Sequence, residues 1–487
     1  MLQVYQEEPN NMDKNKIEIM APAGNFECLI AAIQGGANSV YFGVERLNMR
    51  SHSANNFKMT DLPDIVRLCN QYNVKSYLTL NIVVYDENIK DMELTLDAAL
   101  KAGVTAVIAS DMAAIIYARK IGLEVHISTQ LNVSNAEALR YFAQYADVIV
   151  LARELNLHQV RAIKDVIDRD NICGPSGRLV EIEMFAHGAL CMAISGKCYL
   201  SLHEYGASAN RGSCYQICRR GYEVTDMETG NQLLVDDKYI MSPKDLCTIE
   251  FMDKIIDAGV TVFKIEGRAR SAEYVKKVAS CYRRAADAVC TGTYNPSLAS
   301  TLKEELSEVF NRGFWDGYYQ GARLGEWSDV YGSKSTRRKA YSGKITNWFS
   351  NINVAEILVE SQPLSVGDRI LIMGPTTGVV EYVIPEIRVD LKPVQSAAKG
   401  DLCSILIDWS KVIPGAREEE LGLCGDGCCD NGGDGEGSDR GTAGGELGDK
   451  GGRGDRLGDS EKGADICKAI TETRLRRSDK VYIWKKK

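Results

Sequence analysis

Between residues 16 and 290 the chain alternates short apolar runs with segments in which apolar side chains recur at a helical period. A short apolar, β-branched run is typical of a buried strand, and the longer period is typical of an amphipathic helix. The apolar runs lie at 16–23, 39–44, 74–83, 105–110, 124–133, 147–152, 178–188 and 260–268. Helical patterns separate them, and a cysteine-rich segment follows the seventh. Eight such units predict an α/β fold, a TIM-type (β/α)8 barrel, over 16–290.

The pattern changes after residue 340. Short alternating strands broken by glycine turns fill 341–410, which predicts a small C-terminal β-barrel domain. The run DKVYIWKKK at 479–487 predicts one more strand of this domain, whose expected bounds are 341–416 plus 478–487. We interpret 291–340 as a helical linker and 1–15 as a flexible N-terminus.

A glycine-rich acidic segment, 417–470, interrupts the predicted β-domain. Residues 417–465 hold 14 Asp and Glu, 6 Lys and Arg, and 16 of the 44 glycines. This composition cannot bury enough apolar surface to order itself, so we expect a disordered insertion. Its local charge of −8 equals that of the whole chain, so the remaining residues sum to zero. The acidity of the chain therefore does not argue against RNA as a partner.

Targeting signals are missing from the pattern. No apolar run is long enough to cross a membrane, and the polar first residues lack the apolar core of a secretory signal. We therefore expect a cytoplasmic protein. In a reducing compartment, clustered cysteines more often bind metal or do chemistry than form disulfides, and this chain has 15 cysteines.

Four cysteines, Cys191, Cys198, Cys214 and Cys218, fall within 28 residues after the seventh predicted strand, and Cys247 follows. The spacing matches neither the paired C-x2-C pattern of zinc sites nor the ferredoxin runs. Loops after barrel strands gather at the catalytic face, where thiolates suit a soft metal centre. The spacing leaves an iron–sulfur cluster, zinc and redox thiols open.

Five motifs in order carry a resemblance to a known family. They are IMAPAGNFECLIAAIQGGANSVYFGVERLNMRSHSANNF, FAHGALCMAISGKCYLS, SANRGSCYQICRRGY, SPKDLC and VFKIEGRARSAEYV. Together they resemble the collagenase-like peptidases of unassigned mechanism (the U-type peptidases), and most closely the prephenate-dependent tRNA uridine hydroxylase branch. The resemblance covers residues 16 to 410 and the last nine; the acidic segment departs from it.

The resemblance implies a TIM-like barrel that holds a [4Fe–4S] cluster on four cysteines. It also implies oxygen-independent 5-hydroxylation of the tRNA wobble uridine, with prephenate, a small dicarboxylate, as co-substrate. Cys191, Cys198 and Cys214 match the family's ligands. Members differ in the fourth ligand; here we favour Cys247 and keep Cys218 as the alternative.

Polar residues at the predicted strand ends supply the other candidates. Arg268, followed by Arg270, is expected to bind a carboxylate or phosphate, and Glu266 is expected to orient Arg268 through an ion pair. Further substrate-binding candidates are Asn81 and Gln130, for a base edge, and Arg211 and Arg219, beside the cysteines.

Proteolysis is the first alternative function. A hydrolase needs an activated nucleophile or a metal-bound water, and the chain contains neither HExxH nor GxSxG. The best candidate pair is His187 with Cys191, and a cysteine that binds iron is not a free nucleophile. His187 is a catalytic candidate beside Glu266 and Arg268, but we favour a structural role for it, as an imidazole hydrogen-bonded to the loop backbone or to a cluster sulfur. The second alternative is a non-catalytic metal or cluster protein.

Overall fold

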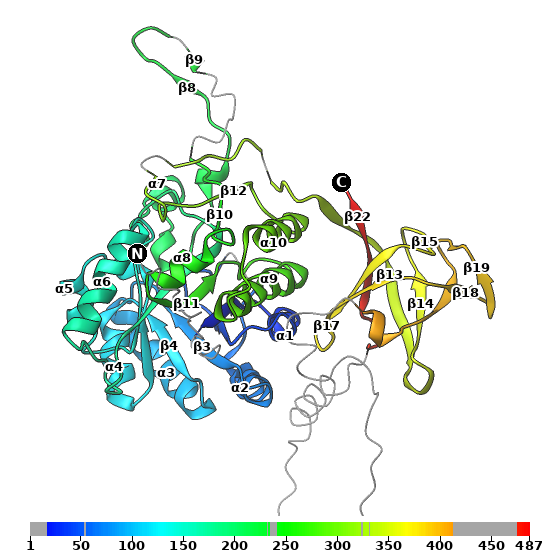
Figure 1. Ribbon diagram of the computed structural model, residues 1–487, viewed down its shortest axis with the longest axis horizontal. Helices are drawn as coiled ribbons and strands as arrows, with labels where there is room; N and C mark the ends of the chain where they lie inside the picture. Colours follow the sequence, from blue (N-terminus) through cyan, green and yellow to red (C-terminus); the bar gives the residue numbers. More distant parts are fainter. Residues whose placement is uncertain are drawn as a thin grey trace, which may run out of the picture.

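The computed structural model describes residues 17–52, 55–230, 232–233, 241–322, 325–330, 332–412 and 475–487. The predicted flexible N-terminus, 1–15, and the predicted acidic insertion, 417–470, lie outside the described residues. Figure 1 shows two bodies, a barrel of strands surrounded by helices and a sheet domain beside it.

Eight parallel strands close the barrel. They are β1 (Glu18–Pro22), β2 (Ser39–Phe42), β3 (Lys75–Leu80), β4 (Ala106–Ala109), β5 (Glu124–Ile127), β6 (Val148–Val150), β7 (Glu181–Ala189) and β11 (Val260–Ile265). Each pairs in parallel with the next, and β11 pairs with both β7 and β1. The predicted TIM-type barrel is therefore confirmed. The strands read as nearly continuous apolar runs because both of their faces are covered.

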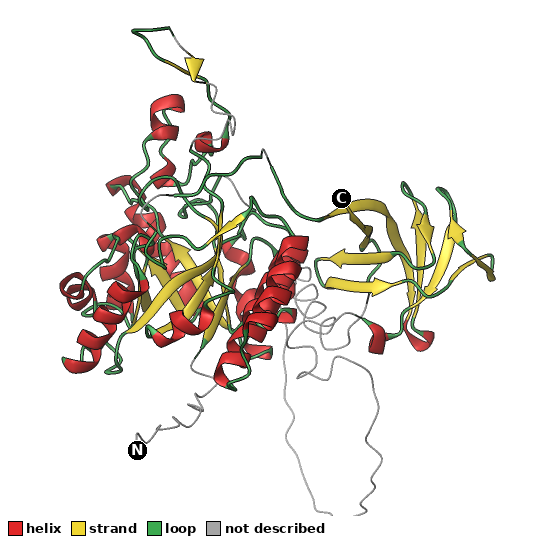
Figure 2. Ribbon diagram, turned by 45° about the horizontal axis from the view of Figure 1, so that its top comes forward, coloured by secondary structure: helices red, strands yellow, loops and turns green. Residues whose placement is uncertain are grey.

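Helices follow the strands and form the outer layer, red around the yellow strands in Figure 2. They are α1 (Phe26–Gln34), α2 (Leu62–Gln71), α3 (Ile89–Ala102), α4 (Met112–Ile121), α5 (Ala136–Phe142), α6 (Leu157–Arg169), α8 (Met252–Asp257) and α9 (Ala272–Cys290). The side chains of Asn25, Asp111 and Asn135 accept hydrogen bonds from backbone N–H groups and begin three of these helices. Gly103 and Gly122, both in the left-handed conformation, follow α3 and α4 and end these two helices.

The connection between β7 and β11 carries the cysteines. It contains α7 (Leu200–Tyr205), the hairpin β8 (Val224–Thr225) and β9 (Gln232–Leu233), and β10 (Asp245–Cys247). The hairpin projects away from the barrel at the top of Figure 1. Strand β10 runs antiparallel to β7 and extends the barrel sheet. The cysteine segment therefore covers the end of the barrel at which β7 ends.

Residues 291–340, expected as a helical linker, pack against the barrel. Helix α10 (Pro296–Glu308) lies against α9, where Arg284 donates to Glu305 over 2.9 Å. Strand β12 (Phe314–Trp315) pairs with β10. Buried side chains of this segment belong to the core of the barrel; they include Leu302, Leu306, Trp315 and Tyr319.

The C-terminal domain is an antiparallel β-structure with a core of its own, as the pattern after residue 340 predicts. Its strands are β13 (Arg337–Phe349), β14 (Val354–Val359), β15 (Leu364–Ser365), β16 (Arg369–Gly374), β17 (Gly378–Val383), β18 (Ile387–Val389), β19 (Lys392–Val394), β20 (Ser396–Ala397), β21 (Leu402–Leu406) and β22 (Lys480–Lys486). Eight of them form one sheet, and β15 pairs with β20. Strand β22, red in Figure 1, lies between β13 and β16, so the last residues of the chain belong to this sheet.

Helix α1 joins the two bodies. The Gln34 side chain donates to the backbone oxygen of Thr377 over 3.1 Å and accepts from the backbone N–H of Val379 over 3.0 Å. Lys339 of β13 forms an ion pair with Glu273 of α9, at 2.9 Å. Among the described helices, none is long and apolar enough to cross a membrane.

Candidate active site

A cavity of about 210 Å³ opens at the end of the barrel where the parallel strands finish. Strand ends supply one wall, with Tyr41, Thr79, Phe185, Lys264 and Glu266 among the lining residues. The segment 189–219 supplies the opposite wall. TIM-type barrels place their active sites at this end because the βα loops converge there.

Cys191, Cys198, Cys214 and Cys218 all line this cavity. Cys191 is exposed and the other three are half-buried. Burial raises the pKa of Cys218 to about 11; Arg219 lowers it, and the other three thiols raise it further because neighbouring thiolates repel. Burial likewise raises the pKa of Cys198, and Cys191 and Cys214 add to the shift. The four thiols thus share one electrostatic environment that a bound cation would stabilise.

Cys247 does not belong to this group. It lies buried in β10, outside the cavity lining, with the Tyr282 hydroxyl 4.0 Å from its sulfur. Burial raises the pKa of Cys247 to about 12. The reason is the pairing of β10 with β7, which sets Cys247 opposite His187, and Tyr282 of α9 contacts both side chains. Of the two candidates for the fourth position, Cys218 lines the cavity with the other three cysteines and Cys247 does not.

The donor set fits the [4Fe–4S] group in type and number. Four cysteine thiolates are the usual ligands of such a cluster, one to each iron. All four cysteines line the cavity, and no group of three or more His, Cys, Asp or Glu side chains among the described residues is arranged to hold a single metal ion. A mononuclear zinc site would instead bring each sulfur to about 2.3 Å from one point.

His187 is buried away from the cavity. Its ring lies against Tyr274, Tyr282 and Phe314, with 3.4 Å between Nδ1 and the Tyr282 hydroxyl. Burial, with a smaller effect of Arg270, lowers the pKa of His187 to about 3, so the imidazole is neutral. The structure does not bring His187 and Cys191 together as a catalytic pair.

A register shift explains why the side chain of His187 faces away from the cavity. The pairing of β7 with β11 slips between Phe185 and His187, a β-bulge that interrupts the alternation of side chains along the strand. Phe185 faces the cavity, and strict alternation would send His187 to the same side. The bulge turns it toward α9.

Cationic side chains dominate the cavity lining. They are Arg50, Arg153, Arg219, Lys264, Arg268, Arg270 and Arg312, against one carboxylate, Glu266. Three of the seven have carboxylate partners: Arg50 with Glu266 at 2.8 Å, Lys264 with Glu183 at 2.7 Å, and Arg312 with Asp245 at 3.3 Å.

The other four, Arg153, Arg219, Arg268 and Arg270, form no ion pair with a carboxylate of the described residues. Arg268 is buried and the other three are half-buried. A buried charge without a counter-charge is costly, so a bound anion would stabilise Arg268 in particular. The cavity is therefore suited to an anion with more than one negative charge.

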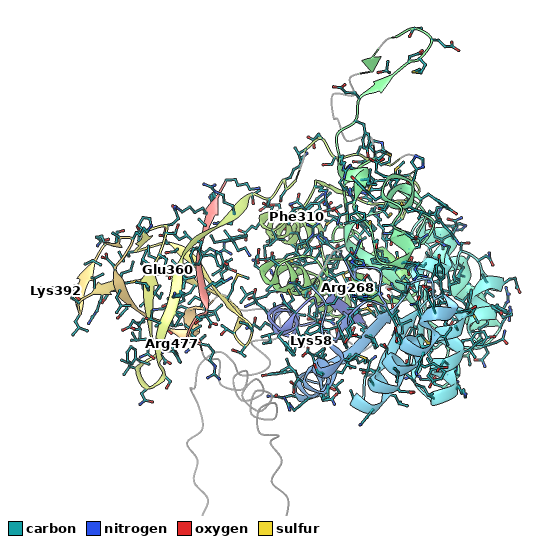
Figure 3. The ribbon with its side chains drawn as sticks, turned by 180° about the vertical axis from the view of Figure 1, so that it is seen from behind. Lys58, Arg268, Phe310, Glu360, Lys392 and Arg477 are labelled. Atoms are coloured by element: carbon teal, nitrogen blue, oxygen red, sulfur yellow. The ribbon has the colours of Figure 1, made fainter. Side chains whose placement is uncertain are left out.

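Arg268 is the most deeply placed of these cations; Figure 3 labels it within the barrel body. Its guanidinium donates to Asn48 Oδ1 over 2.7 Å and to Thr79 Oγ1 over 3.1 Å. It packs so closely on Gly43 that a Cβ there would collide with it. Burial lowers the pKa of Arg268 to about 10, which leaves it protonated at neutral pH. Neutral side chains thus fix the position of the Arg268 guanidinium, and its positive charge can interact with an anion in the cavity.

Glu266 pairs with Arg50 and not with Arg268, which corrects the ion pair expected from the sequence. Burial favours a raised pKa for Glu266, but the charge and hydrogen bond of Arg50 outweigh it and the pKa is lowered. The carboxylate is therefore ionised and does not serve as a proton donor at neutral pH.

The remaining sequence candidates divide between the cavity and its outside. Asn81 and Gln130 line the cavity, and so do Arg219 and Arg270; the guanidinium of Arg270 lies 3.5 Å from the ring centre of Phe310. Arg211 lies outside the lining. It stacks 3.6 Å from the Tyr85 ring and donates to Asn88 over 3.0 Å.

Sequence reasoning missed Arg312 altogether. This side chain reaches the cavity from the segment assigned as a linker. Arg50 and Arg153 lie in the loops that follow β2 and β6, which places them at the barrel mouth, but nothing in the pattern distinguishes them from solvated arginines.

The family model of Peptidase family U32 matches residues 24–329. The chain belongs to this family. A U32 relative named collagenase, from Porphyromonas gingivalis, is 59% identical over 403 residues, which cover 83% of this chain and 97% of the relative.

Two further relatives of this U32 chain are named for RNA modification. The tRNA hydroxylation protein P1 of Bacillus subtilis is 33% identical over 368 residues, which cover 74% of this chain and 84% of the relative. A 23S rRNA 5-hydroxycytidine synthase of Escherichia coli is 33% identical over 322 residues, which cover 65% of this chain and 47% of the relative. The family thus includes proteins named for proteolysis and proteins named for hydroxylation of RNA.

Proposed function

We propose that this chain is an RNA hydroxylase that holds a [4Fe–4S] cluster on Cys191, Cys198, Cys214 and Cys218. The observation that carries the proposal is that these four thiols share one cavity with four arginines that have no carboxylate partner among the described residues. Relatives named for tRNA and rRNA hydroxylation support it. The finer form of the proposal places the new hydroxyl on C5 of the wobble uridine of tRNA.

The unpaired arginines suit the dicarboxylate co-substrate, prephenate, that the family resemblance implies. Guanidinium groups bind carboxylates through two parallel hydrogen bonds, which fix orientation as well as charge. Arg268 and Arg270, both at the end of β11, hold one carboxylate in this proposal, and Arg219 on the opposite wall holds the other. The amides of Asn81 and Gln130 remain for the edge of the base.

The overall exchange balances without molecular oxygen. A hydroxyl group moves from a carbon of the donor to the base, and a hydrogen takes its place on the donor. The base loses two electrons and the donor gains the same two. When bound, the cluster supplies one-electron transfer beside the cavity. The residues of the chain bind and orient both partners, and the ionised Glu266 holds Arg50 at the wall.

Proteolysis is the second candidate, since the relative that is 59% identical is named collagenase. Hydrolysis of a peptide needs a nucleophile beside a general base. Among the described residues that line the cavity there is no histidine, and the one carboxylate is bound by Arg50. The geometry therefore favours hydroxylation.

Nucleoside analysis of a deletion strain tests the proposal. We expect 5-hydroxyuridine derivatives to disappear from tRNA, or 5-hydroxycytidine from rRNA, and to return with the wild-type gene but not with Cys198→Ser. Cys69→Ser, a buried cysteine of α2, is the matched control and restores the modification. An unchanged nucleoside profile in both RNA classes would reject hydroxylation of these RNAs. Digestion of gelatin by metal-free protein would favour the peptidase.

A further inference from the structure

Exposed apolar side chains gather beside the cavity. Of the 21 large apolar residues that are exposed among the described residues, six lie between 192 and 215; they are Met192, Ile194, Tyr199, Leu202, Tyr205 and Tyr215. The exposed fraction reaches 73% for Tyr199 and 54% for Tyr215. Apolar surface concentrated in this way marks an interaction site, because scattered exposure is what an ordinary surface shows.

We name this surface the aromatic rim and define it by Met192, Ile194, Tyr199, Tyr205, Tyr215 and Arg220. The rim adjoins the cavity directly. Met192 and Ile194 line the cavity themselves. Tyr199 stands between the lining residues Cys198 and Leu200, and Tyr215 stands between Cys214 and Gln216. A molecule bound at the rim therefore lies beside the proposed reaction site.

The rim combines aromatic faces with positive charge. The rings of Tyr205 and Tyr215 lie 5.1 Å apart, and the guanidinium of Arg220 lies 5.5 Å from the Tyr205 ring. Arg220 also donates to the Tyr205 hydroxyl over 2.5 Å, which holds the two side chains together. The segment 191–222 carries four Lys and Arg against one Glu. Aromatic rings interleaved with cations are how proteins hold unpaired nucleotides.

We propose that the aromatic rim docks an unpaired loop of RNA, whose bases stack on Tyr199, Tyr205 and Tyr215 while one neighbouring base enters the cavity. The inference rests on the proposed function for the fate of that base. A base inside a duplex cannot reach a cavity at the barrel mouth, so the target must leave its stack, and stacking of its neighbours on the rim stabilises that state. A polypeptide offers neither phosphates nor a succession of flat rings, so it suits the rim less well.

RNA binding by the full-length protein, purified with its cluster, tests the proposal. The probes are a fluorescent RNA hairpin with an unpaired loop and a fully paired duplex of the same length. We expect Tyr199→Ala, Tyr205→Ala and Tyr215→Ala each to weaken hairpin binding about tenfold, since each ring stacks on one base. The matching Phe variants keep the ring and should bind as the wild type does. Tyr141→Ala, which removes an exposed tyrosine of α5, is the control and should change nothing.

Two results would overturn the proposal. One is hairpin binding that is absent, or unchanged in all three alanine variants. The other is a loss of gelatin binding in these variants without a loss of RNA binding. Iron content and thermal unfolding of each variant check that the fold and the cluster persist. If the rim variants lose RNA binding but the wild type hydroxylates no RNA, docking at the aromatic rim is supported and the proposed function is contradicted. If hydroxylation occurs and the rim variants bind RNA normally, the rim alone fails.

Discussion

Two layers of the barrel differ in whether their cationic side chains have carboxylate partners. In the middle layer, Lys264 pairs with Glu183 at 2.7 Å, and His126 lies between Glu183 at 3.7 Å and Glu124 at 3.6 Å. At the mouth, which Lys264 also lines, Arg50 and Arg312 have carboxylate partners, whereas Arg153, Arg219, Arg268 and Arg270 have none among the described residues. The barrel is able to supply counter-charges, so their lack at these four arginines indicates a place kept for a ligand.

The pKa directions express the same contrast. Burial alone would lower the pKa of His126, but Glu124 and Glu183 outweigh it and raise the pKa to about 9. Burial lowers the pKa of Arg268 to about 10, and the charge of Arg50 lowers it further, while Tyr41 and Glu266 act in the opposite direction. Two carboxylates stabilise the charged form of His126, whereas at Arg268 burial outweighs the stabilising effects of Tyr41 and Glu266. An anionic ligand at the mouth would restore the balance there.

Removal of the Glu183 carboxylate from the middle layer should lower the free energy of unfolding more than any other change considered. Glu183→Gln leaves Lys264 buried and unpaired, so we expect the free energy of unfolding to fall by about 3–5 kcal/mol. Denaturant titration measures it. The double variant Glu183→Gln, Lys264→Met removes both charges and should regain part of the loss. A fall below about 1 kcal/mol would show that the pairing in this layer is not needed.

Removal of a cation from the mouth should affect binding and leave stability nearly intact. Arg268→Gln deletes a charge that has no carboxylate partner in the described part of the chain, so we expect the free energy of unfolding to change by less than about 1 kcal/mol. Affinity for the dicarboxylate should fall at least tenfold, since a charge-assisted hydrogen bond contributes about 1.5–3 kcal/mol. Calorimetric titration with prephenate measures the affinity. Equal affinity in variant and wild type would contradict the assignment.

The pH dependence of stability should report the paired layer. The folded pKa of His126, about 9, exceeds its unfolded value of about 6.5. Its contribution is therefore complete below pH 6.5 and is lost as pH rises through 9. We expect the free energy of unfolding to decrease over this interval by on the order of 3 kcal/mol. His126→Gln should flatten the slope, and an unchanged slope would assign it to other groups.

Removal of an exposed ion pair should change the free energy of unfolding least. Arg388 and Glu386 are about half exposed and form an ion pair in the β-domain. Arg388→Ala should change the free energy of unfolding by less than about 0.5 kcal/mol, because solvent screens such pairs. Denaturant titration compares it directly with Glu183→Gln. A larger change would mean that exposure does not separate the two kinds of pair.

The sequence predicts the barrel well because eight apolar runs at strand length, separated by helical periods, admit few folds. It also predicts Cys191, Cys198 and Cys214 at the mouth, since they follow the seventh strand directly. It does not decide between Cys218 and Cys247. That choice depends on the antiparallel pairing of β10 with β7, a long-range contact that no local pattern encodes.

Long-range pairing also explains the other site residues whose surroundings the sequence does not predict. His187 stands at a strand end, but the bulge beside it turns the side chain away from the cavity. The partner of Glu266 is Arg50, which is more than two hundred residues earlier in the chain, and not the adjacent Arg268. Arg312 reaches the cavity because β12 pairs with β10. Local pattern places a residue on an element, whereas register and pairing decide what its side chain meets.

The central claim is that Cys191, Cys198, Cys214 and Cys218 together hold an inorganic cluster. Iron and acid-labile sulfide in anaerobically purified full-length protein, compared between Cys218→Ser and Cys247→Ser, tests it most directly. We expect Cys247→Ser to keep the wild-type iron and sulfide content and Cys218→Ser to lose most of both. Full iron and sulfide in Cys218→Ser with loss in Cys247→Ser, or zinc in place of iron in the wild type, would contradict it.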